Sequence, residues 1–294
     1  MYGILQQCLG VEAVTDKEIL WHAKCHQTFL HRSLFEARGA DGTEWLETEV
    51  VAAAVRQCPP STSVAALWIA MKEADVVPLG DDSLTLSLMS GRGLVPGQIT
   101  ELFGEAAVGK TQLLLLTVLS TCAKGGVAIY IATEDIPATR LSQLAEHVAR
   151  QHQRTATELL ERLFLRRVKS AAEMTDLLTS GNFDEVARLN PLRLVVLDSI
   201  AAMQWDEGFS VQQGEAWRSL AARLRVVVLI ANQVRFTDDN PALGLAWSHF
   251  VHTRLHLHRY QKASVRRLSI VFSPHLPQNQ VSVIITEKGV ELSV

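Results

Sequence analysis

Apolar stretches of two kinds alternate from Leu79 onward. The short ones are nearly continuous and rich in Val and Ile, which is typical of strands buried on both faces of a sheet, whereas the longer ones repeat their apolar residues at helical spacing. This alternation predicts an α/β fold with a mostly parallel central sheet covered by helices on both faces. The predicted strands are Ile99–Phe103, Val127–Thr133, Phe164–Val168, Leu192–Asp198 and Val226–Ala231, and the predicted helices are Gln112–Ala123, Thr139–Gln151, Ala171–Thr179 and Gln213–Leu224.

The pattern changes in the C-terminal part of the chain. Polar and apolar residues alternate one by one in three segments, Arg254–Tyr260, Arg266–Phe272 and Gln280–Thr286. A period of two is typical of antiparallel strands with one face exposed. We therefore expect these segments to extend the parallel sheet with antiparallel strands.

Residues 1–58 predict a small helical domain. The segment Thr43–Gln57 has an apolar stripe, and glycine and proline mark the turns around it. Because no side chains suited to catalysis cluster there, a helical appendage is favoured over a DNA-binding role. Residues 59–78 follow as a linker, in which Val64–Ile69 predicts an isolated strand that needs a sheet edge to pair with, in this chain or in another. Residues 79–294 form the main domain.

Composition and charge narrow the class of protein. The 294 residues are 48% hydrophobic and 20% charged, with a formal net charge of −3. A protein that binds duplex DNA alone is usually basic, so a nucleic-acid role here must use a local patch or a complex. The four scattered cysteines indicate reduced thiols in an intracellular protein. Because we find no signal peptide and no apolar run of bilayer length, we expect a cytosolic or nuclear protein without a membrane partner.

The segment Gly104–Thr111 carries the most specific chemistry. It fits the pattern G-x-x-x-x-G-K-[ST], the loop that wraps the phosphates of a nucleoside triphosphate between a strand and a helix. Backbone amides and the start of the helix attract the phosphates, while Lys110 would reach the β and γ oxygens and Thr111 would place its hydroxyl on Mg²⁺. The residues expected around the phosphates are Gly104, Glu105, Ala106, Ala107, Val108, Gly109, Lys110 and Thr111.

Asp198 is the second candidate for the magnesium site. A phosphate loop needs a carboxylate opposite its Thr, and Asp198 closes a buried apolar strand, where that carboxylate is found in ATPases with this loop. The alternative is that Asp198 and Ser199 cap a following helix. The loop upstream favours the metal role.

Two further polar residues end strands at the same sheet edge. Glu134 follows the strand Val127–Thr133 and could polarise the water that attacks the γ-phosphate; the alternative is that Glu134 and Asp135 are solvated loop acids. Asn232-Gln233 follows the strand Val226–Ala231, where an amide could bond the γ-phosphate and act as a sensor of the nucleotide. The alternative there is an amide that satisfies the backbone of a loop.

Several motifs occur together in an order that resembles the RecA/RadA recombinase ATPases, and more narrowly the eukaryotic recombinase paralogues of homologous recombination. Three further pieces, Thr133–Pro137, Pro241–Trp247 and Ser273–Pro277, are similar to the X-ray repair cross-complementing type of these paralogues. The resemblance covers residues 60–294. The segments that carry it are Gly97–Gln112, Tyr130–Asp135 with Arg140 and Leu141, Leu194–Ser199 and Ile230–Val234.

The resemblance implies a RecA-like core that binds ATP and Mg²⁺. In this family Glu134 would be the catalytic glutamate, Gln233 the γ-phosphate sensor, and Gln112 and Arg140 further nucleotide contacts, Arg140 near the adenine. It also implies a slow, DNA-stimulated ATPase in DNA double-strand break repair, present in the nucleus and also the cytoplasm. The implied partners are another recombinase paralogue, recombinase filaments, and single-stranded or branched DNA reached through the complex.

Departures from the family favour a mixed assembly over a filament of this chain alone. The loops Trp205–Gln212 and Arg235–Leu243, which would touch single-stranded DNA, hold as many acids as bases or more. Ser63 replaces the phenylalanine that plugs into a neighbouring subunit, and Phe272 replaces the aspartate that caps the neighbour's ATP. The helix Gln213–Leu224 also runs into its strand with almost no turn.

Three functions are compatible with these residues. The first is a recombination ATPase that pairs with another paralogue and remodels recombinase filaments at broken or stalled DNA. The second is an ATP-binding scaffold in which hydrolysis is vestigial. The third, an unrelated kinase with the same loop, needs an arginine-bearing lid, for which Arg235 and Arg254 are the available residues. Phosphate release by the native chain and by Glu134→Gln would separate the first two.

Overall fold

A nine-stranded sheet runs through the part of the chain that the computed structural model describes, residues 76–202, 211–234, 240–260 and 262–293. The strand order is β3-β2-β4-β5-β1-β6-β7-β8-β9. Neighbours pair in parallel from β3 to β6, and the remaining pairings are antiparallel. The strands are β1 (Ile99–Gly104), β2 (Val127–Ala132), β3 (Leu163–Arg167), β4 (Leu192–Asp198), β5 (Val227–Gln233), β6 (Thr253–Tyr260), β7 (Lys262–Phe272), β8 (Gln280–Thr286) and β9 (Gly289–Leu292).

This architecture confirms the expected α/β core with a parallel centre and an antiparallel C-terminal extension. One detail differs: Arg254–Tyr260, expected as an antiparallel strand, lies in β6, which pairs in parallel with β1 and antiparallel with β7. The predicted helical domain over residues 1–58 lies outside the described residues, so the domain boundaries stay predictions. Outside them, too, lie the linker strand Val64–Ile69 with Ser63 and most of the loops Trp205–Gln212 and Arg235–Leu243. Among the residues that are described, no helix has the length and apolar character to cross a membrane.

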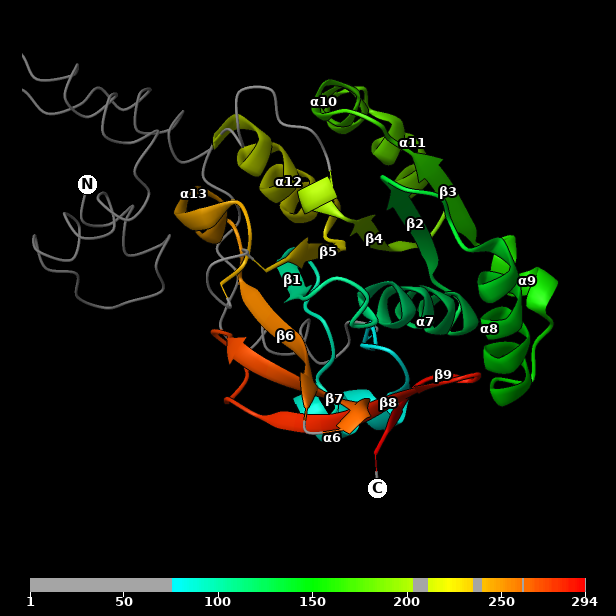
Figure 1. Ribbon diagram of the computed structural model, residues 1–294. Helices are drawn as coiled ribbons and strands as arrows, with labels where there is room; N and C mark the ends of the chain where they lie inside the picture. The colour runs from blue at the N-terminus through cyan, green and yellow to red at the C-terminus, as the bar shows by residue number, and fades with distance from the viewer. Residues whose placement is uncertain (1–75, 203–210, 235–239, 261, 294) are drawn as a thin grey trace, which may run out of the picture. The chain divides into compact units, whose positions relative to one another are not determined.

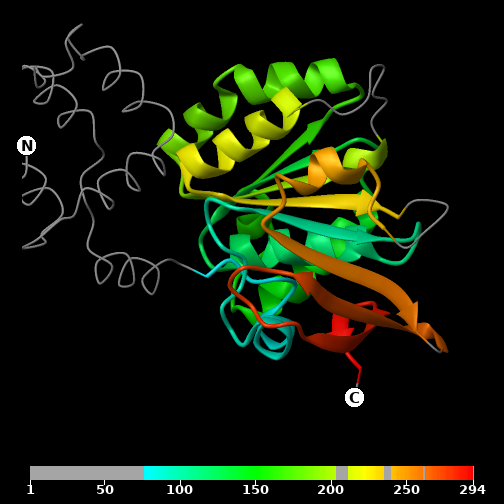
Figure 2. The same cartoon turned by 90° about the vertical axis from the view of Figure 1, so that its left-hand side faces the viewer.

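Helices cover both faces of the parallel strands, as Figures 1 and 2 show. One buried cluster joins the sheet to α6, α7, α8 and α9, and a second joins the opposite face to α10, α11, α12 and α13. The helices are α6 (Asp82–Met89), α7 (Lys110–Ala123), α8 (Ala138–Gln151), α9 (Ala156–Leu160), α10 (Ala171–Thr179), α11 (Asn182–Leu189), α12 (Val211–Leu224) and α13 (Gly244–Ser248), with a short 3₁₀ turn at Ile200–Ala202.

Helix α7 is the central helix of the first face. Every residue from Leu113 to Ala123 is buried, because the helix is apolar all round and packs between the sheet and α8. Thr111 and Gln112, in its first turn, are partly exposed. The burial of the helix therefore fixes its N-terminus at the carboxyl end of β1, with two polar side chains left accessible there.

The junction between α12 and β5 explains how a helix can lead into a strand with almost no turn. Arg225, directly after the helix, adopts a left-handed conformation with φ of 51°. The amide of Val226 then donates to the carbonyl of Ala221 at 3.2 Å, which closes the helix with a Schellman-type cap. Arg225 alone therefore reverses the chain direction, at a position after the helix where glycine is the usual residue.

Candidate nucleotide-binding site

The phosphate-loop segment connects β1 to α7 as the sequence predicts. Both glycines lie where a side chain would collide with a neighbour. A Cβ on Gly104 would come within 2.0 Å of the Leu257 carbonyl oxygen, and one on Gly109, where φ is 114°, within 2.2 Å of Ile285 Cδ1. Strand β6 and the end of β8 thus approach the loop as closely as a bare backbone allows.

The β6–β7 hairpin holds the loop from outside. Arg259 donates from Nη1 to the Glu105 carboxylate at 3.0 Å, and Arg266 donates from Nε to the Val108 carbonyl at 3.3 Å. The first contact joins two half-exposed side chains, and the second holds a carbonyl of the loop backbone. The Glu105 side chain is therefore directed at Arg259, and what Glu105 offers to a phosphate is its backbone amide.

Lys110 is held inside the loop. Its Nζ donates to the carbonyl oxygens of Gly104 and Glu105, both at 2.7 Å, and the side chain is buried. Burial lowers the pKa of the Lys110 ammonium, and the negative charges of Asp198 and Glu105 oppose this shift. The two loop carbonyls accept hydrogen bonds from the ammonium, as phosphate oxygens would. These bonds keep the Lys110 ammonium inside the phosphate loop.

Thr111 and Asp198 lie side by side at the start of α7 and the end of β4. The Thr111 hydroxyl donates to Asp198 Oδ2 at 2.7 Å, and the Tyr130 hydroxyl donates to the same oxygen at 2.7 Å. Both donors come from segments other than the one that follows Asp198, so the alternative of a helix cap does not describe these contacts. Burial, with the charge and hydrogen bond of Asp198, raises the pKa of Tyr130, so the phenol stays protonated and donates.

These oxygen groups fit a magnesium ion. Mg²⁺ prefers oxygen ligands, keeps several waters and commonly takes one or two side chains plus the substrate's phosphates. A hydroxyl that donates its proton still has lone pairs for a cation, and an ionised carboxylate has several acceptor positions. Within the described residues, no cluster of three or more His, Cys, Asp or Glu side chains offers a metal cage. The pair Thr111 and Asp198 is therefore suited to a metal that arrives with a nucleotide.

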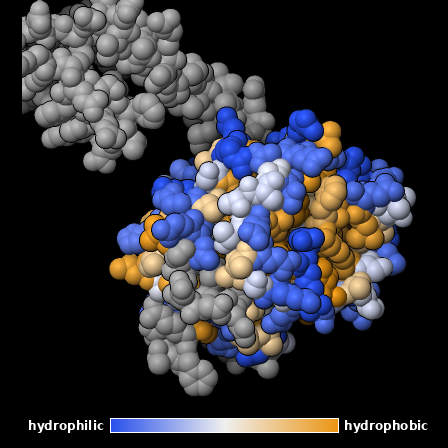
Figure 3. Space-filling view, turned by 90° about the horizontal axis from the view of Figure 1, so that it is seen from above, coloured by the Kyte–Doolittle hydropathy of each residue, from blue (hydrophilic) through white to orange (hydrophobic). Residues whose placement is uncertain are grey.

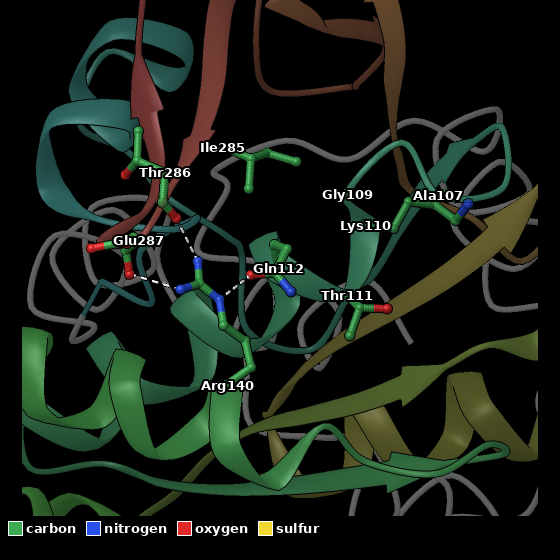
Figure 4. Close-up of a pocket in the computed structure, with 9 residues that line it drawn as sticks. All are labelled: Ala107, Gly109, Lys110, Thr111, Gln112, Arg140, Ile285, Thr286 and Glu287. Carbon is green, nitrogen blue, oxygen red and sulfur yellow. Dashed lines mark hydrogen bonds between the residues drawn. The ribbon is translucent and has the colours of Figure 1, made fainter. Parts of the chain in front are cut away.

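A cavity of about 720 Å³ opens beside the loop. This volume lies within the range of small-molecule and cofactor sites, roughly 300–1,000 Å³. Of the residues predicted around the phosphates, Gly104, Glu105, Ala106 and Val108 are not in its lining, because they face the strands or solvent. Figure 4 shows the lining residues, which are Ala107, Gly109, Lys110, Thr111, Gln112, Arg140, Ile285, Thr286 and Glu287.

Arg140 closes the end of the cavity away from the loop. Its guanidinium, on α8, donates to Gln112 Oε1 at 2.7 Å and to the carbonyl oxygens of Thr286 and Glu287 at 2.6 and 2.8 Å (Figure 4). Three elements, α7, α8 and the turn between β8 and β9, are joined at this side chain. Sequence reasoning placed Arg140 and Gln112 near the nucleotide but missed the wall formed by Ile285, Thr286 and Glu287.

Glu134 and Gln233 both lie at the carboxyl edge of the sheet, on either side of Asp198. The strand that leads to Glu134 ends at Ala132, one residue earlier than predicted, and the amide of Thr133 donates to the Asp198 carbonyl at 2.9 Å. Gln233 is the last residue of β5 and pairs in register with Gly104. In the described part of the chain, neither side chain is among those that line the cavity. Glu134 is exposed to solvent.

The neighbours of these two residues are engaged elsewhere. Asp135 pairs with Arg167 of β3 at 2.6 Å. Asn232 is fully buried and donates from Nδ2 to Glu101 at 2.7 Å and to the Ala242 carbonyl at 2.9 Å. For Asn232, the alternative interpretation, an amide that satisfies a loop backbone, is the one that describes its contacts. Gln233 remains the candidate sensor of this pair.

Sequence reasoning also missed Tyr130. It lies in an apolar strand, in register with Val196, two residues before the partner of Asp198. The available signal was a hydroxyl within a run of buried apolar residues, because a buried phenol requires an acceptor. The identity of that acceptor depends on the pairing of β2 with β4, which the sequence pattern does not specify.

Comparison with known proteins identifies the family. Residues 72–293 match the Rad51 family. The chain is 30% identical over 215 residues to the DNA repair and recombination protein RadB of Halobacterium salinarum, across 67% of this chain and 86% of RadB. It is 31% identical over 248 residues to the DNA repair protein XRCC3 of Mus musculus, across 68% of this chain and 71% of XRCC3.

Two further matches agree. The DNA repair protein Rad51 homolog of Drosophila melanogaster is 30% identical over 248 residues, across 74% of this chain and 70% of that protein. The crystal structure of the RadB recombinase superposes with a TM-score of 0.60 at 25% identity, across 74% of this chain and 100% of that one. The similarity to recombinases and to XRCC3 that the motifs indicated is confirmed. The chain belongs to the Rad51 family.

Proposed function

We propose that this chain binds ATP with Mg²⁺ and hydrolyses it slowly, with stimulation by DNA. The observation that carries the proposal is a cavity lined by Lys110 and Thr111, with Asp198 accepting the Thr111 hydroxyl beside it and Arg140 closing its other end. An ammonium, a helix N-terminus, a hydroxyl and a carboxylate together suit a triphosphate and its cation.

Each residue has one task in this proposal. Lys110 binds the β- and γ-phosphates, and Thr111 and Asp198 would hold Mg²⁺, which supplies positive charge to the phosphate oxygens when it is bound. Glu134 orients and deprotonates the attacking water, and Gln233 senses the γ-phosphate. Arg140 and Gln112 bind the base end of the nucleotide. The exposed position of Glu134 is compatible with a base that acts once the nucleotide is bound.

We further propose a biological role in DNA double-strand break repair by homologous recombination, in the nucleus. The names of RadB, XRCC3 and the Rad51 homolog, which are DNA repair proteins, support it. In this role the chain joins another recombinase paralogue in a hetero-complex that assembles or remodels recombinase filaments on single-stranded DNA and at stalled forks. The net charge of −3 supports DNA contact through the complex more than through this chain alone.

The β3 edge of the sheet supports binding to a partner. β3 is the terminal strand of the sheet, and its residues after Leu163 are exposed, including Phe164 at 41% and Leu165 at 47%. An open edge strand with apolar side chains is a template for strand addition by another chain. In the view from above, hydrophobic side chains gather in the right half of the molecule (Figure 3).

Nucleotide binding is tested with Lys110→Ala. We expect loss of ATP affinity with the fold retained, because the side chain binds the phosphates and fills no hydrophobic space. Lys124→Ala, at the other end of α7 and paired with Asp82, is the matched control and should bind ATP normally. Unchanged ATP affinity in Lys110→Ala would contradict the proposed site.

Hydrolysis is tested separately, because two observations favour a second candidate function, an ATP-binding scaffold. Glu134 is not among the residues that line the cavity, and Phe272 stands in the place of an acid. Phosphate release by the purified complex is compared for the native chain, Glu134→Gln and Asp135→Asn. A catalytic Glu134 predicts a drop only in Glu134→Gln. Equal rates of phosphate release by all three proteins would contradict a catalytic Glu134 and favour the ATP-binding scaffold.

A further inference from the structure

We infer that Tyr130 is a positioning residue of the nucleotide site, whose hydroxyl fixes the Asp198 carboxylate for cation binding together with Thr111. The inference deepens the proposed function and rests on it, because it concerns the same site. It gives a role to a side chain that lies at the start of the motif segment Tyr130–Asp135 but to which the sequence assigns no task.

The geometry around Asp198 Oδ2 carries the inference. This oxygen receives the Thr111 hydroxyl at 2.7 Å and the Tyr130 hydroxyl at 2.7 Å, so one oxygen accepts two donors that come from α7 and β2. Rotation of the carboxylate would break both hydrogen bonds together. The orientation of Asp198 is thus determined by two other elements of the fold, and its other oxygen, Oδ1, keeps acceptor capacity of its own.

The Tyr130 ring gives this arrangement its rigidity. The residue is 1% exposed and packs in the hydrophobic cluster between the sheet and α7, where its hydroxyl is the polar tip of an otherwise apolar side chain. A phenylalanine would fill the same space. Leaving a buried hydroxyl without an acceptor costs about 1–3 kcal/mol, so the phenol is accommodated here because Asp198 accepts its hydrogen bond. The ring therefore acts as a fixed support for the carboxylate.

Groups behind a metal ligand influence how well the ligand binds. Hydrogen-bond partners of ligating carboxylates and histidines set their orientation, and removing one typically costs about 10- to 100-fold in metal affinity or activity. Tyr130 stands in this relation to Asp198. The effect we expect is therefore on the dependence of nucleotide binding on Mg²⁺, and much less on binding without the metal.

The first experiment compares Tyr130→Phe with the native full-length chain. Binding of a fluorescent ATP analogue is titrated with Mg²⁺, and again in EDTA. We expect the Mg²⁺ concentration for half-maximal binding to rise by about tenfold, while affinity in EDTA stays within about twofold. Thr121→Val is the matched control, because it also deletes one buried hydroxyl, which donates to a carbonyl within α7. The control should leave the Mg²⁺ dependence unchanged.

The outcomes separate this inference from the proposed function. If the native chain binds the analogue in a Mg²⁺-dependent way and Tyr130→Phe does the same at the same concentrations, the role of Tyr130 is wrong and the proposed function stands. If the native chain does not bind the analogue, the proposed function itself fails. An equal shift in Thr121→Val would show that loss of any buried hydroxyl has this effect, which also overturns the inference.

A second measurement uses the native Tyr130, in case Tyr130→Phe does not fold. The chain has three tyrosines, so labelling with 3-fluorotyrosine gives three ¹⁹F signals, and Tyr2→Phe and Tyr260→Phe assign the other two. We expect the Tyr130 signal of the ATP-bound chain to shift when Mg²⁺ replaces EDTA. A signal that stays in place when Mg²⁺ is added would contradict a link between Tyr130 and the cation.

Discussion

Two carboxylates of the parallel sheet are surrounded by donors of different kinds. Asp198, at the end of β4, accepts two hydroxyl groups and is partly exposed. Glu101, inside β1, is fully buried and accepts N–H groups, from Asn232 and Trp247 at 2.7 Å each and from the Arg254 guanidinium at 2.5 Å. Arg254 also donates to Ser248, which ties the network to α13.

The difference lies in what the donors retain. An N–H group has no lone pair left for a cation, and the positive charge of Arg254 already balances Glu101. A hydroxyl that donates to Asp198 keeps lone pairs, and Thr111 faces the cavity. The first carboxylate is therefore open to a ligand and the second is closed by the protein. The kind of donor, together with the difference in burial, therefore distinguishes the carboxylate that we propose binds a cation from the structural one.

The largest effect is expected where the closed network is broken. Glu101→Ala leaves Arg254 and Asn232 without their buried acceptor, and removing one partner of a buried ion pair costs about 3–5 kcal/mol. We expect a loss of this size in the free energy of unfolding, measured by chemical denaturation without nucleotide. The control, Glu215→Ala, removes a half-exposed partner of Arg218 and should cost no more than about 1 kcal/mol. If Glu101→Ala and Glu215→Ala lost the same free energy of unfolding, the buried network of Glu101 would be no more important for stability than an exposed ion pair.

Substitution of Asp198, the carboxylate open to a ligand, should change nucleotide binding and leave the free energy of unfolding almost unchanged. Asp198→Asn keeps an oxygen that can accept the two hydroxyls but removes the charge that attracts a cation. We expect Mg²⁺-dependent ATP affinity to fall by about 10- to 100-fold, with the free energy of unfolding changed by less than about 1 kcal/mol. Isothermal titration and denaturation measure the two quantities, and Asp135→Asn serves as control. A large loss of unfolding free energy in Asp198→Asn would show that Asp198, like Glu101, has a structural role.

A smaller effect is expected at the other end of the cavity, away from both carboxylates. Arg140→Lys keeps the charge but cannot reach Gln112 and the two carbonyls of the β8–β9 turn at once. We expect ATP affinity to fall by about tenfold, the size of one lost charged hydrogen bond, with the Mg²⁺ concentration for half-maximal binding unchanged. Arg150→Lys, on the exposed end of the same helix, is the control. A changed Mg²⁺ dependence would argue against separate base and metal ends.

The smallest effect concerns pH and a histidine at the amino end of β1. Burial, with Arg218 and His275, lowers the pKa of His252 below its usual 6.5, and its Nδ1 accepts the amide of Ile99. Because the pKa of His252 is lower in the folded chain than in the unfolded chain, protons bind the unfolded chain more tightly. Its contribution to stability is therefore present above pH 6.5 and is lost as the pH falls from 6.5 through the pKa of the folded chain.

His252→Gln tests this assignment, because glutamine can accept the same amide but does not titrate. Below pH 6.5 we expect the free energy of unfolding to fall less steeply in the variant than in the native chain. His147, whose pKa is also lowered, is present in both chains and cancels in the comparison. Identical slopes would assign the acid sensitivity to groups other than His252.

Much of the fold could be predicted because the information is local. The spacing of apolar residues and the length of each apolar segment predicted the parallel strands and helices α7, α8, α10 and α12, within two residues at most ends. The phosphate loop was predictable because it is a contiguous motif. The elements that the patterns did not predict are short or have few buried residues. Helix α11 buries Phe183 alone, and β9 has four residues that are a strand because they pair with β8.

The candidate site was predictable only in part, for a related reason. Strand ends indicated Asp198, Glu134 and Gln233, since carboxyl ends of parallel strands meet at one edge. The bonds of Tyr130 to Asp198 and of Arg140 to the β8–β9 turn join segments distant in sequence, and their register depends on the assembled sheet. Glu101 could have been noticed, since a carboxylate within a buried strand needs a partner.

The wall behind Arg140 has a consequence for synthesis. Arg140 and Thr286 are 146 residues apart, so at about 5–20 residues per second a ribosome takes roughly 7–30 s to make the second after the first. During this interval the nascent chain carries its phosphate loop but lacks one side of the chamber beside it. The cavity is therefore completed late in synthesis, and a message truncated before codon 285 yields a product with an intact motif and an incomplete cavity beside it.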